Sequence, residues 1–220
     1  MPEILWGLGF AACHQLPTHS LFCGTDQIPW CARCSGFYWG AFIAIIFLAL
    51  FRTIRAGRPP LPVVIILGLG TILLAADALS DMFGWRSSTG FTRLGSGLWM
   101  GLSIPPLLWS WIARHSGGDE NRAVVGYSWL MTVFGSAGLI LWLGLTAPQW
   151  AWWLLAGGTA LGQIGLWGLV NVAVMGLIIT EGRLRWFWII LIAFVFLLLE
   201  LLLLGMIHLA LLGLVMPFTG

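Results

Sequence analysis

The feature that most constrains this fold is a succession of apolar segments, each about as long as a bilayer is thick. The bilayer core measures about 30 Å and a helix rises about 1.5 Å per residue, so a membrane-spanning helix needs roughly 20 apolar residues. Segments of this kind cover residues 35–51, 61–79, 94–113, 124–146, 150–180 and 186–216. Because the backbone must satisfy its own hydrogen bonds in lipid, such segments form helices. We therefore predict an all-α, polytopic transmembrane helical bundle of about six spans.

The composition supports a membrane protein and argues against a nucleic-acid-binding one. Hydrophobic residues make up 60% of the chain and charged residues 8%, which is too little polar surface for a protein in water. The net charge of +2 is small, and the arginines are scattered between apolar segments. The expected partner is the lipid bilayer, with other subunits of a membrane complex as a further candidate, and no nucleic acid.

The loops between the apolar segments differ in their arginine content. Alternate loops place seven arginines on one side of the membrane and three on the other. The seven are Arg52, Arg55, Arg58, Arg114, Arg122, Arg183 and Arg185, and the three are Arg33, Arg86 and Arg93. Since cytoplasmic loops are enriched in Arg and Lys, we predict that the three loops with seven arginines are cytoplasmic. The other side, which holds residues 13–34, is then extracytoplasmic.

One segment concentrates the chain's reactive groups. Residues 13–40, here called the Cys/His segment, hold all four cysteines and two of the four histidines. Thiolates and imidazoles bind zinc and iron, and a structural zinc site needs four tetrahedral ligands. We predict an extracytoplasmic zinc or iron site, structural or redox-supporting, with ligands drawn from Cys13, His14, Cys23, Cys31 and Cys34.

Two other uses of the cysteines remain open. Cys31 and Cys34 form a C-x-x-C pair that could cycle between dithiol and disulfide, with Cys13 and Cys23 as a shuttle pair. In the third alternative, disulfides hold the loop in place and have no catalytic role. The sequence does not assign the chain as an enzyme. Within the metal hypothesis we expect Cys34 to be the more acidic thiol of the Cys31 and Cys34 pair and the tighter ligand, because it lies in the first turn of a helix.

Several charged residues are expected near the Cys/His segment. Asp77 and Asp81 lie four residues apart at the outer end of the second span, and therefore on one helical face. They would either support the metal site or form ion pairs with Arg33, Arg86 and Arg93. Arg33 would also lower the pKa of a neighbouring thiol.

The glycines after Cys34 predict a close helix contact. Gly36 and Gly40 lie on one face and would let another backbone approach, as small residues do between membrane helices. Candidate partners are Gly97 and Gly101 of the third span, or the Asp77 end of the second span.

Glu200 and His208 are ionisable residues inside the last span, where such residues are costly and often functional. Counting back from the preceding turn places Gln163 or Trp167 beside Glu200. A buried, hydrogen-bonded pair is one interpretation. The alternative is that His208 is an axial ligand to a haem or chlorophyll-type ring, in a subunit of an electron-transfer or photosynthetic complex.

The Cys/His segment resembles a family signature. CHQ-x-P, followed by P-x-C-A-R-C-x-G-x-Y-x-G, is similar to the motif of the small prokaryotic membrane proteins catalogued as domain of unknown function 2085 (DUF2085). A second block, R-x-x-T-G-x-x-R-x-x-x-G, runs from Arg86 to Gly97. The resemblance covers roughly residues 10–115 and implies a prokaryotic cell membrane. Relative to the motif, Cys23 is an addition. We accordingly divide the chain into a family-like membrane domain, 1–123, and a three-span extension, 124–220.

Overall fold

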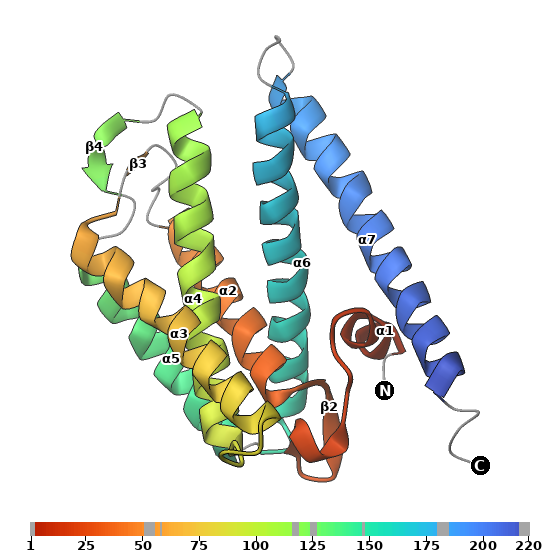
Figure 1. Cartoon of the computed structure of the whole chain (residues 1–220). Coiled ribbons are helices and arrows are strands. Elements are labelled where there is room, and N and C mark those ends of the chain that lie inside the picture. The colour runs from red at the N-terminus through yellow and green to blue at the C-terminus, as the bar shows by residue number, and fades with distance from the viewer. Residues whose placement is uncertain are drawn as a thin grey trace.

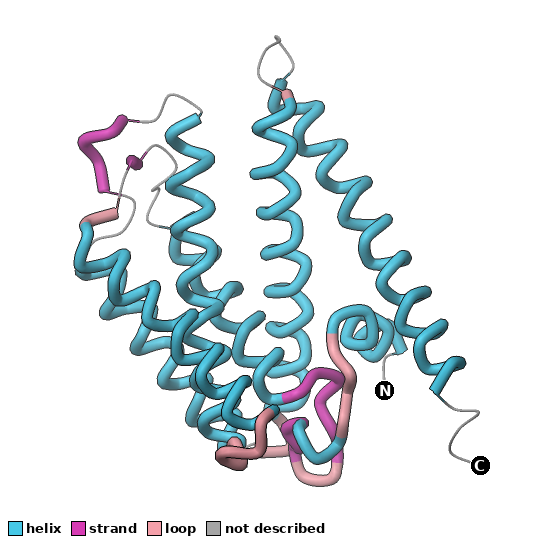
Figure 2. The backbone as a smooth tube through the Cα atoms, viewed as in Figure 1, coloured by secondary structure: helices cyan, strands magenta, loops and turns pink. Residues whose placement is uncertain are grey.

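The computed structural model describes residues 3–50, 56–57, 59–115, 119–123, 127–146, 148–179 and 185–215, and most of them are helical (Figures 1 and 2). The helices are α1 (Glu3–Ala12), α2 (Ala32–Leu50), α3 (Leu61–Met82), α4 (Gly90–His115), α5 (Tyr127–Thr146), α6 (Ala151–Ile178) and α7 (Arg185–Val215). A 3₁₀ turn, η1 (Pro17–His19), precedes the antiparallel hairpin β1 (Ser20–Cys23) and β2 (Asp26–Cys31). Short strands β3 (Ala56–Gly57) and β4 (Asp119–Ala123) pair in parallel. The predicted all-α class is confirmed.

Within the described residues, five helices are long and apolar enough to cross a membrane, judged by length and composition: α2, α3, α5, α6 and α7. The remaining predicted span, α4, is a helix of 26 residues but is less apolar than the others. Its polar residues Arg93, Ser103 and Ser110 are buried inside the protein, where lipid does not select for an apolar surface. A count of six spans therefore depends on α4 and stays a prediction.

Helix α2 lies at the centre of the bundle, with α4 packed along one side and α6 along another (Figure 1). The hairpin β1–β2 lies at one end, beside the turns from α3 to α4 and from α5 to α6. Strands β3 and β4 and the start of α7 lie at the opposite end. Arg33, Arg86 and Arg93 thus share the hairpin end, and Arg185 lies at the other. Of the other arginines in the count, Arg52, Arg55, Arg58 and Arg183 lie outside the described residues.

Helices α6 and α7 diverge from their connection, and α1 lies between them at the hairpin end. Figure 1 views α1 nearly along its axis while α6 and α7 run across the picture, so α1 lies crosswise to both. Helix α7 contacts α6 near their connection and α1 near its far end. Helices α5, α6 and α7 therefore pack on the N-terminal part through α1, β2, α2 and α4. The division into two domains stays a prediction.

Four glycines bring α2 and α4 into backbone contact. A β-carbon on Gly36 would meet the Leu94 carbonyl, and one on Gly40 would meet the Leu98 carbonyl. From the other helix, a β-carbon on Gly97 would meet the Arg33 carbonyl, and one on Gly101 the Phe37 carbonyl. The predicted close contact of Gly36 and Gly40 with the Gly97 and Gly101 face of the third span is confirmed.

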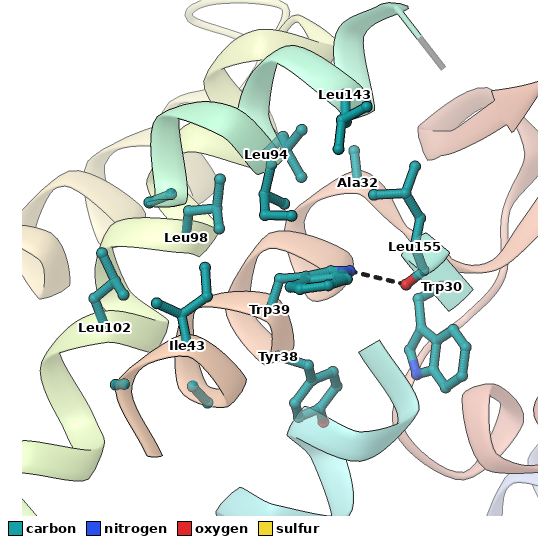
Figure 3. Close-up of a cluster of buried hydrophobic side chains, with 14 of the residues drawn as sticks. Trp30, Ala32, Tyr38, Trp39, Ile43, Leu94, Leu98, Leu102, Leu143 and Leu155 are labelled. Carbon is teal, nitrogen blue, oxygen red and sulfur yellow. Dashed lines mark hydrogen bonds between the residues drawn. The ribbon is translucent and has the colours of Figure 1, made fainter. Parts of the chain in front are cut away.

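The α2–α6 contact is built around Trp39. Its indole Nε1–H donates to the Leu155 carbonyl oxygen at 2.9 Å (Figure 3), and its ring packs against Gly158. Leu94, Leu98 and Leu102 of α4 are almost fully buried in the same cluster. A buried indole needs a partner for its N–H, so this bond helps to fix the distance between α2 and α6.

We predict that Gly101→Leu destabilises the bundle, because its side chain would meet the Phe37 carbonyl of α2 instead of a movable side chain. Overpacking typically costs about 1–3 kcal/mol. Thermal unfolding in detergent, followed by helical circular dichroism, should shift down by several degrees. Gly168→Leu on α6 is the matched control, since a β-carbon there meets nothing within 4 Å. Equal melting temperatures for the two variants would contradict the close contact.

Candidate metal centre

Three elements bring cysteines to the hairpin end of the bundle. Cys13 directly follows α1, and its N–H donates to the Gly9 carbonyl at 2.8 Å. The chain then turns at Gln15, which has a left-handed φ of 52°. Cys31 is the last residue of β2, and Cys34 lies in the first turn of α2. The sites of the three sulfurs are thus fixed by a helix end, a strand end and a helix start.

The Sγ atoms of Cys13, Cys31 and Cys34 all lie within 4.8 Å of one another. We call these three atoms the sulfur cluster. Zinc–sulfur bonds of about 2.3 Å in a tetrahedron place neighbouring sulfurs about 3.8 Å apart, so the cluster has the dimensions of a thiolate metal site. Cys13 and Cys31 are buried and Cys34 is partly buried. The donors present could therefore hold a thiophilic ion such as zinc or iron.

Hydrogen bonds from neighbouring groups favour the thiolate form of Cys13. The side chains of Cys31 and then Cys34 hydrogen-bond to its sulfur and lower the pKa of Cys13 to about 2. The backbone N–H of Cys31 also donates to Cys13 Sγ, at 3.2 Å. The same thiol–thiolate contact raises the pKa of Cys31. The expectation that Cys34 is the more acidic thiol of its pair is wrong, because Cys13 is the cysteine whose thiolate these hydrogen bonds stabilise.

The other predicted ligands lie around the sulfur cluster. His14 Nδ1 is 3.8 Å from Cys13 Sγ, and His14 Nε2 is 3.4 Å from His19 Nδ1. His14 is exposed, and burial followed by the charge of Arg93 lowers the pKa of His19. Cys23 is fully buried on β1 opposite Asp26 and is not one of the three clustered sulfurs. Burial, and then the Asp26 charge, raises the pKa of Cys23.

All five charged residues predicted near the site belong to one ion-pair network. Asp77 accepts from Arg33 at 2.6 Å and from Arg86 at 2.9 Å. Asp81 accepts from Arg93 at 2.9 Å and lies 3.8 Å from Arg33. The network joins the start of α2 to the end of α3 and the start of α4, directly beside the Cys31-x-x-Cys34 pair.

Sequence reasoning missed three polar residues that organise this end of the molecule. Ser88 donates to Asp77 Oδ1 through its hydroxyl at 2.9 Å and to Asp81 Oδ1 through its N–H at 3.1 Å. Gln15 donates to the Trp6 and Pro29 carbonyls at 3.0 and 2.9 Å, and Gln27 donates to the Gln15 carbonyl at 2.9 Å. Gln15 belongs to the CHQ-x-P motif, which was the available signal for it.

The intramembrane polar residues each have a partner, and two of them hold α1. Trp30 Nε1–H donates to Gln163 Oε1 at 2.9 Å, and Gln163 Nε2 donates to the Leu8 carbonyl at 3.1 Å. His208 Nδ1 lies 2.6 Å from the Phe10 carbonyl, and its ring stacks on Phe10 at 3.8 Å. Two carbonyls in the second half of α1 thus receive polar side chains from α6 and α7.

Glu200 has a different partner from the one we predicted. Asn171 Nδ2 donates to Glu200 Oε2 at 2.9 Å, so neither Gln163 nor Trp167 fills that place. The prediction assumed that the last two helices run antiparallel and side by side, so that residues equally far from the turn between them lie at the same level. Asn171 is nearer than Gln163 and Trp167 to the end of α6 at Ile178, so Glu200 pairs closer to the α6–α7 connection than residue counting indicates.

Comparisons with known proteins agree with the resemblance seen in the motif. The family model described as "Predicted membrane protein (DUF2085)" matches residues 13–105, which confirms the resemblance over that segment. Uncharacterized protein MJ1492 of Methanocaldococcus jannaschii is 28% identical over 92 residues, covering 42% of this chain and 58% of that protein. An uncharacterized protein of Methanothermobacter thermautotrophicus is 25% identical over 95 residues, covering 43% of this chain and 82% of that protein. The chain therefore matches less than two thirds of the length of the first relative. No solved structure matches significantly.

We predict that Asp77→Asn destabilises the protein by about 3 kcal/mol, because it leaves Arg33 and Arg86 without their shared counter-charge. The Asp77 side chain is 5% exposed, whereas that of Asp81 is 21% exposed. Asp81→Asn is therefore the graded control, with a smaller expected loss. Thermal unfolding in detergent measures both. An Asp77→Asn protein no less stable than Asp81→Asn would contradict a central role for Asp77.

Proposed function

We propose that this chain, whose residues 13–105 carry the DUF2085 match, is an integral membrane protein that holds one zinc or iron ion at Cys13, Cys31 and Cys34. The observation that carries the proposal is the convergence of three sulfurs within 4.8 Å. The lowered pKa of Cys13 adds support, because metals bind the thiolate form. A bound ion would neutralise the thiolates and crosslink the end of α1, the hairpin and the start of α2.

The fourth ligand is proposed to come from the exposed side of the sulfur cluster. His14 is the nearest predicted candidate, with Nδ1 3.8 Å from Cys13 Sγ. A site closed by His14 would be structural, whereas a site that leaves this position to water or another molecule would be open to chemistry. Cys23 would take no part in either arrangement.

A membrane thiol/disulfide protein is the second candidate function, and the Cys13 thiolate beside Cys31 favours it. Oxidation of Cys31 and Cys34 would form one S–S bond and release two electrons and two protons to an acceptor such as a quinone. Cys13 would then be the third thiol for exchange, in place of the Cys13–Cys23 shuttle pair inferred from sequence.

We predict that the purified protein carries about one equivalent of zinc or iron, and that Cys13→Ser, Cys31→Ser and Cys34→Ser each lose it. Cys23→Ser is the matched control and should keep the metal, because Cys23 is outside the sulfur cluster. Elemental analysis measures the metal, and intact mass after thiol alkylation counts free thiols before and after chelation. Metal-free protein with Cys31 and Cys34 joined in a disulfide would replace the metal proposal with the redox one. Full metal retention in Cys34→Ser would overturn the ligand set.

We further propose that the hairpin end faces the outside of a prokaryotic cell, on the basis of the arginine count. Trp85 is highly exposed on the α3–α4 turn, and Asp119 lies on β4 at the opposite end. Trp85→Cys should react with a membrane-impermeant maleimide on intact cells, while Asp119→Cys should react only after permeabilisation. The parent chain gives the background from native cysteines. The reverse labelling pattern would invert the topology.

A further inference from the structure

A cavity of about 700 Å³ lies between α3, α4 and α5, and none of the three clustered cysteines lines it. Its volume falls within the range of roughly 300–1,000 Å³ that is typical of small-molecule sites. Leu73, Trp99 and Phe134 contribute to its walls, one from each helix. The ion-pair network supplies part of its lining, so the cavity adjoins charged groups on one side.

The cavity has a polar end and an apolar interior. Its polar lining comes from the end of α3, the following turn and the first two turns of α4: Asp77, Ser80, Arg86, Thr92 and Ser96. The rest of the lining is almost entirely apolar and lies further along the three helices. A ligand that matches this arrangement has a polar head and a hydrocarbon chain.

The guanidinium at the polar end favours an anionic head. Asp77 and Arg86 are the charged residues that line the cavity, and the ion-pair network behind them has three arginines against two aspartates, which leaves one excess positive charge in the network as a whole. Arg86 is the arginine that lines the cavity, and 54% of its side chain is exposed. One of its nitrogens donates to Asp77 Oδ1 at 2.9 Å, and a guanidinium has five N–H donors in all. Arg86 can therefore hold Asp77 and an anionic oxygen at the same time.

We infer that this cavity binds one anionic phospholipid, with the phosphate at Arg86 and a hydrocarbon chain between α3, α4 and α5. The exposed Arg86 guanidinium selects the anionic head, and the apolar walls hold the chain. The hydroxyls of Ser80, Thr92 and Ser96 lie at the same end, but each donates to a backbone carbonyl oxygen three residues before it, so Arg86 is the donor proposed for the head. This inference is independent of whether the sulfur cluster binds a metal.

Two glycines allow the cavity to be filled without disturbing the bundle. Gly95 on α4 and Gly138 on α5 both line it, and a β-carbon at either meets nothing within 4 Å. Gly138→Leu and Gly95→Leu should therefore fold and occupy the space of the hydrocarbon chain. Gly68→Leu on α3 is the matched control, because Gly68 is equally open but does not line the cavity.

The test is native mass spectrometry of the full-length protein in detergent, with phosphatidylglycerol or phosphatidylcholine of identical acyl chains. The parent and Gly68→Leu should retain one phosphatidylglycerol per chain, with at least tenfold preference over phosphatidylcholine. Gly138→Leu and Gly95→Leu should lose retention, and Arg86→Gln should lose the preference between the two lipids. Circular dichroism and melting temperature establish that each variant is folded.

Three results would overturn the inference. They are equal retention of both lipids by the parent, no retention of either lipid, and unchanged retention in both folded leucine variants. The cavity is filled at two positions, so if either Gly95→Leu or Gly138→Leu fails to fold, lipid retention by the other variant decides the test. Metal content, measured on the same samples, should be unchanged by all of these substitutions, which separates this result from the fate of the metal proposal.

Discussion

The backbone contact between α2 and α4 is the constraint on which the hairpin end depends. Gly97 touches the Arg33 carbonyl, so the turn of α2 that carries Arg33 and Cys34 is held directly against α4. With α2 fixed there, the Arg33 guanidinium can reach Asp77 on α3 at 2.6 Å. This one backbone contact thereby sets the position of both the Arg33 guanidinium and the Cys34 sulfur. A larger residue at any of the four glycines would move them together.

Buried polar groups attach α1 to distant parts of the chain. A buried polar group needs a partner, and a backbone carbonyl oxygen has two lone pairs with which it can accept a side-chain donor. Gln163 of α6 and His208 of α7 donate to Leu8 and Phe10. Because Cys13 follows α1 directly, its position depends on residues almost 200 positions later in the chain. The C-terminal helices are thus part of what shapes the sulfur cluster.

The sequence predicted features that follow from composition and local spacing, and failed where register decides the outcome. Apolar length predicted the helices, and four-residue spacing predicted the glycine contact and the common face of Asp77 and Asp81. Spacing could not tell Cys23 from the other cysteines, because the hairpin register pairs Cys23 with Asp26 and Ser20 with Cys31. The partner of Glu200, Asn171, depends on how α7 is placed along α6, which no local pattern records.

The charge balance around Cys13 connects the ion-pair network with the proposed site. We expected Arg33 to lower the pKa of a neighbouring thiol, yet its guanidinium is held by Asp77 and lies near Asp81. Hydrogen bonds from Cys31 and Cys34 lower the pKa of Cys13 instead. Because the aspartates engage Arg33, this guanidinium is not free to pair with the Cys13 thiolate. In the proposed site, a metal ion would supply that positive charge instead.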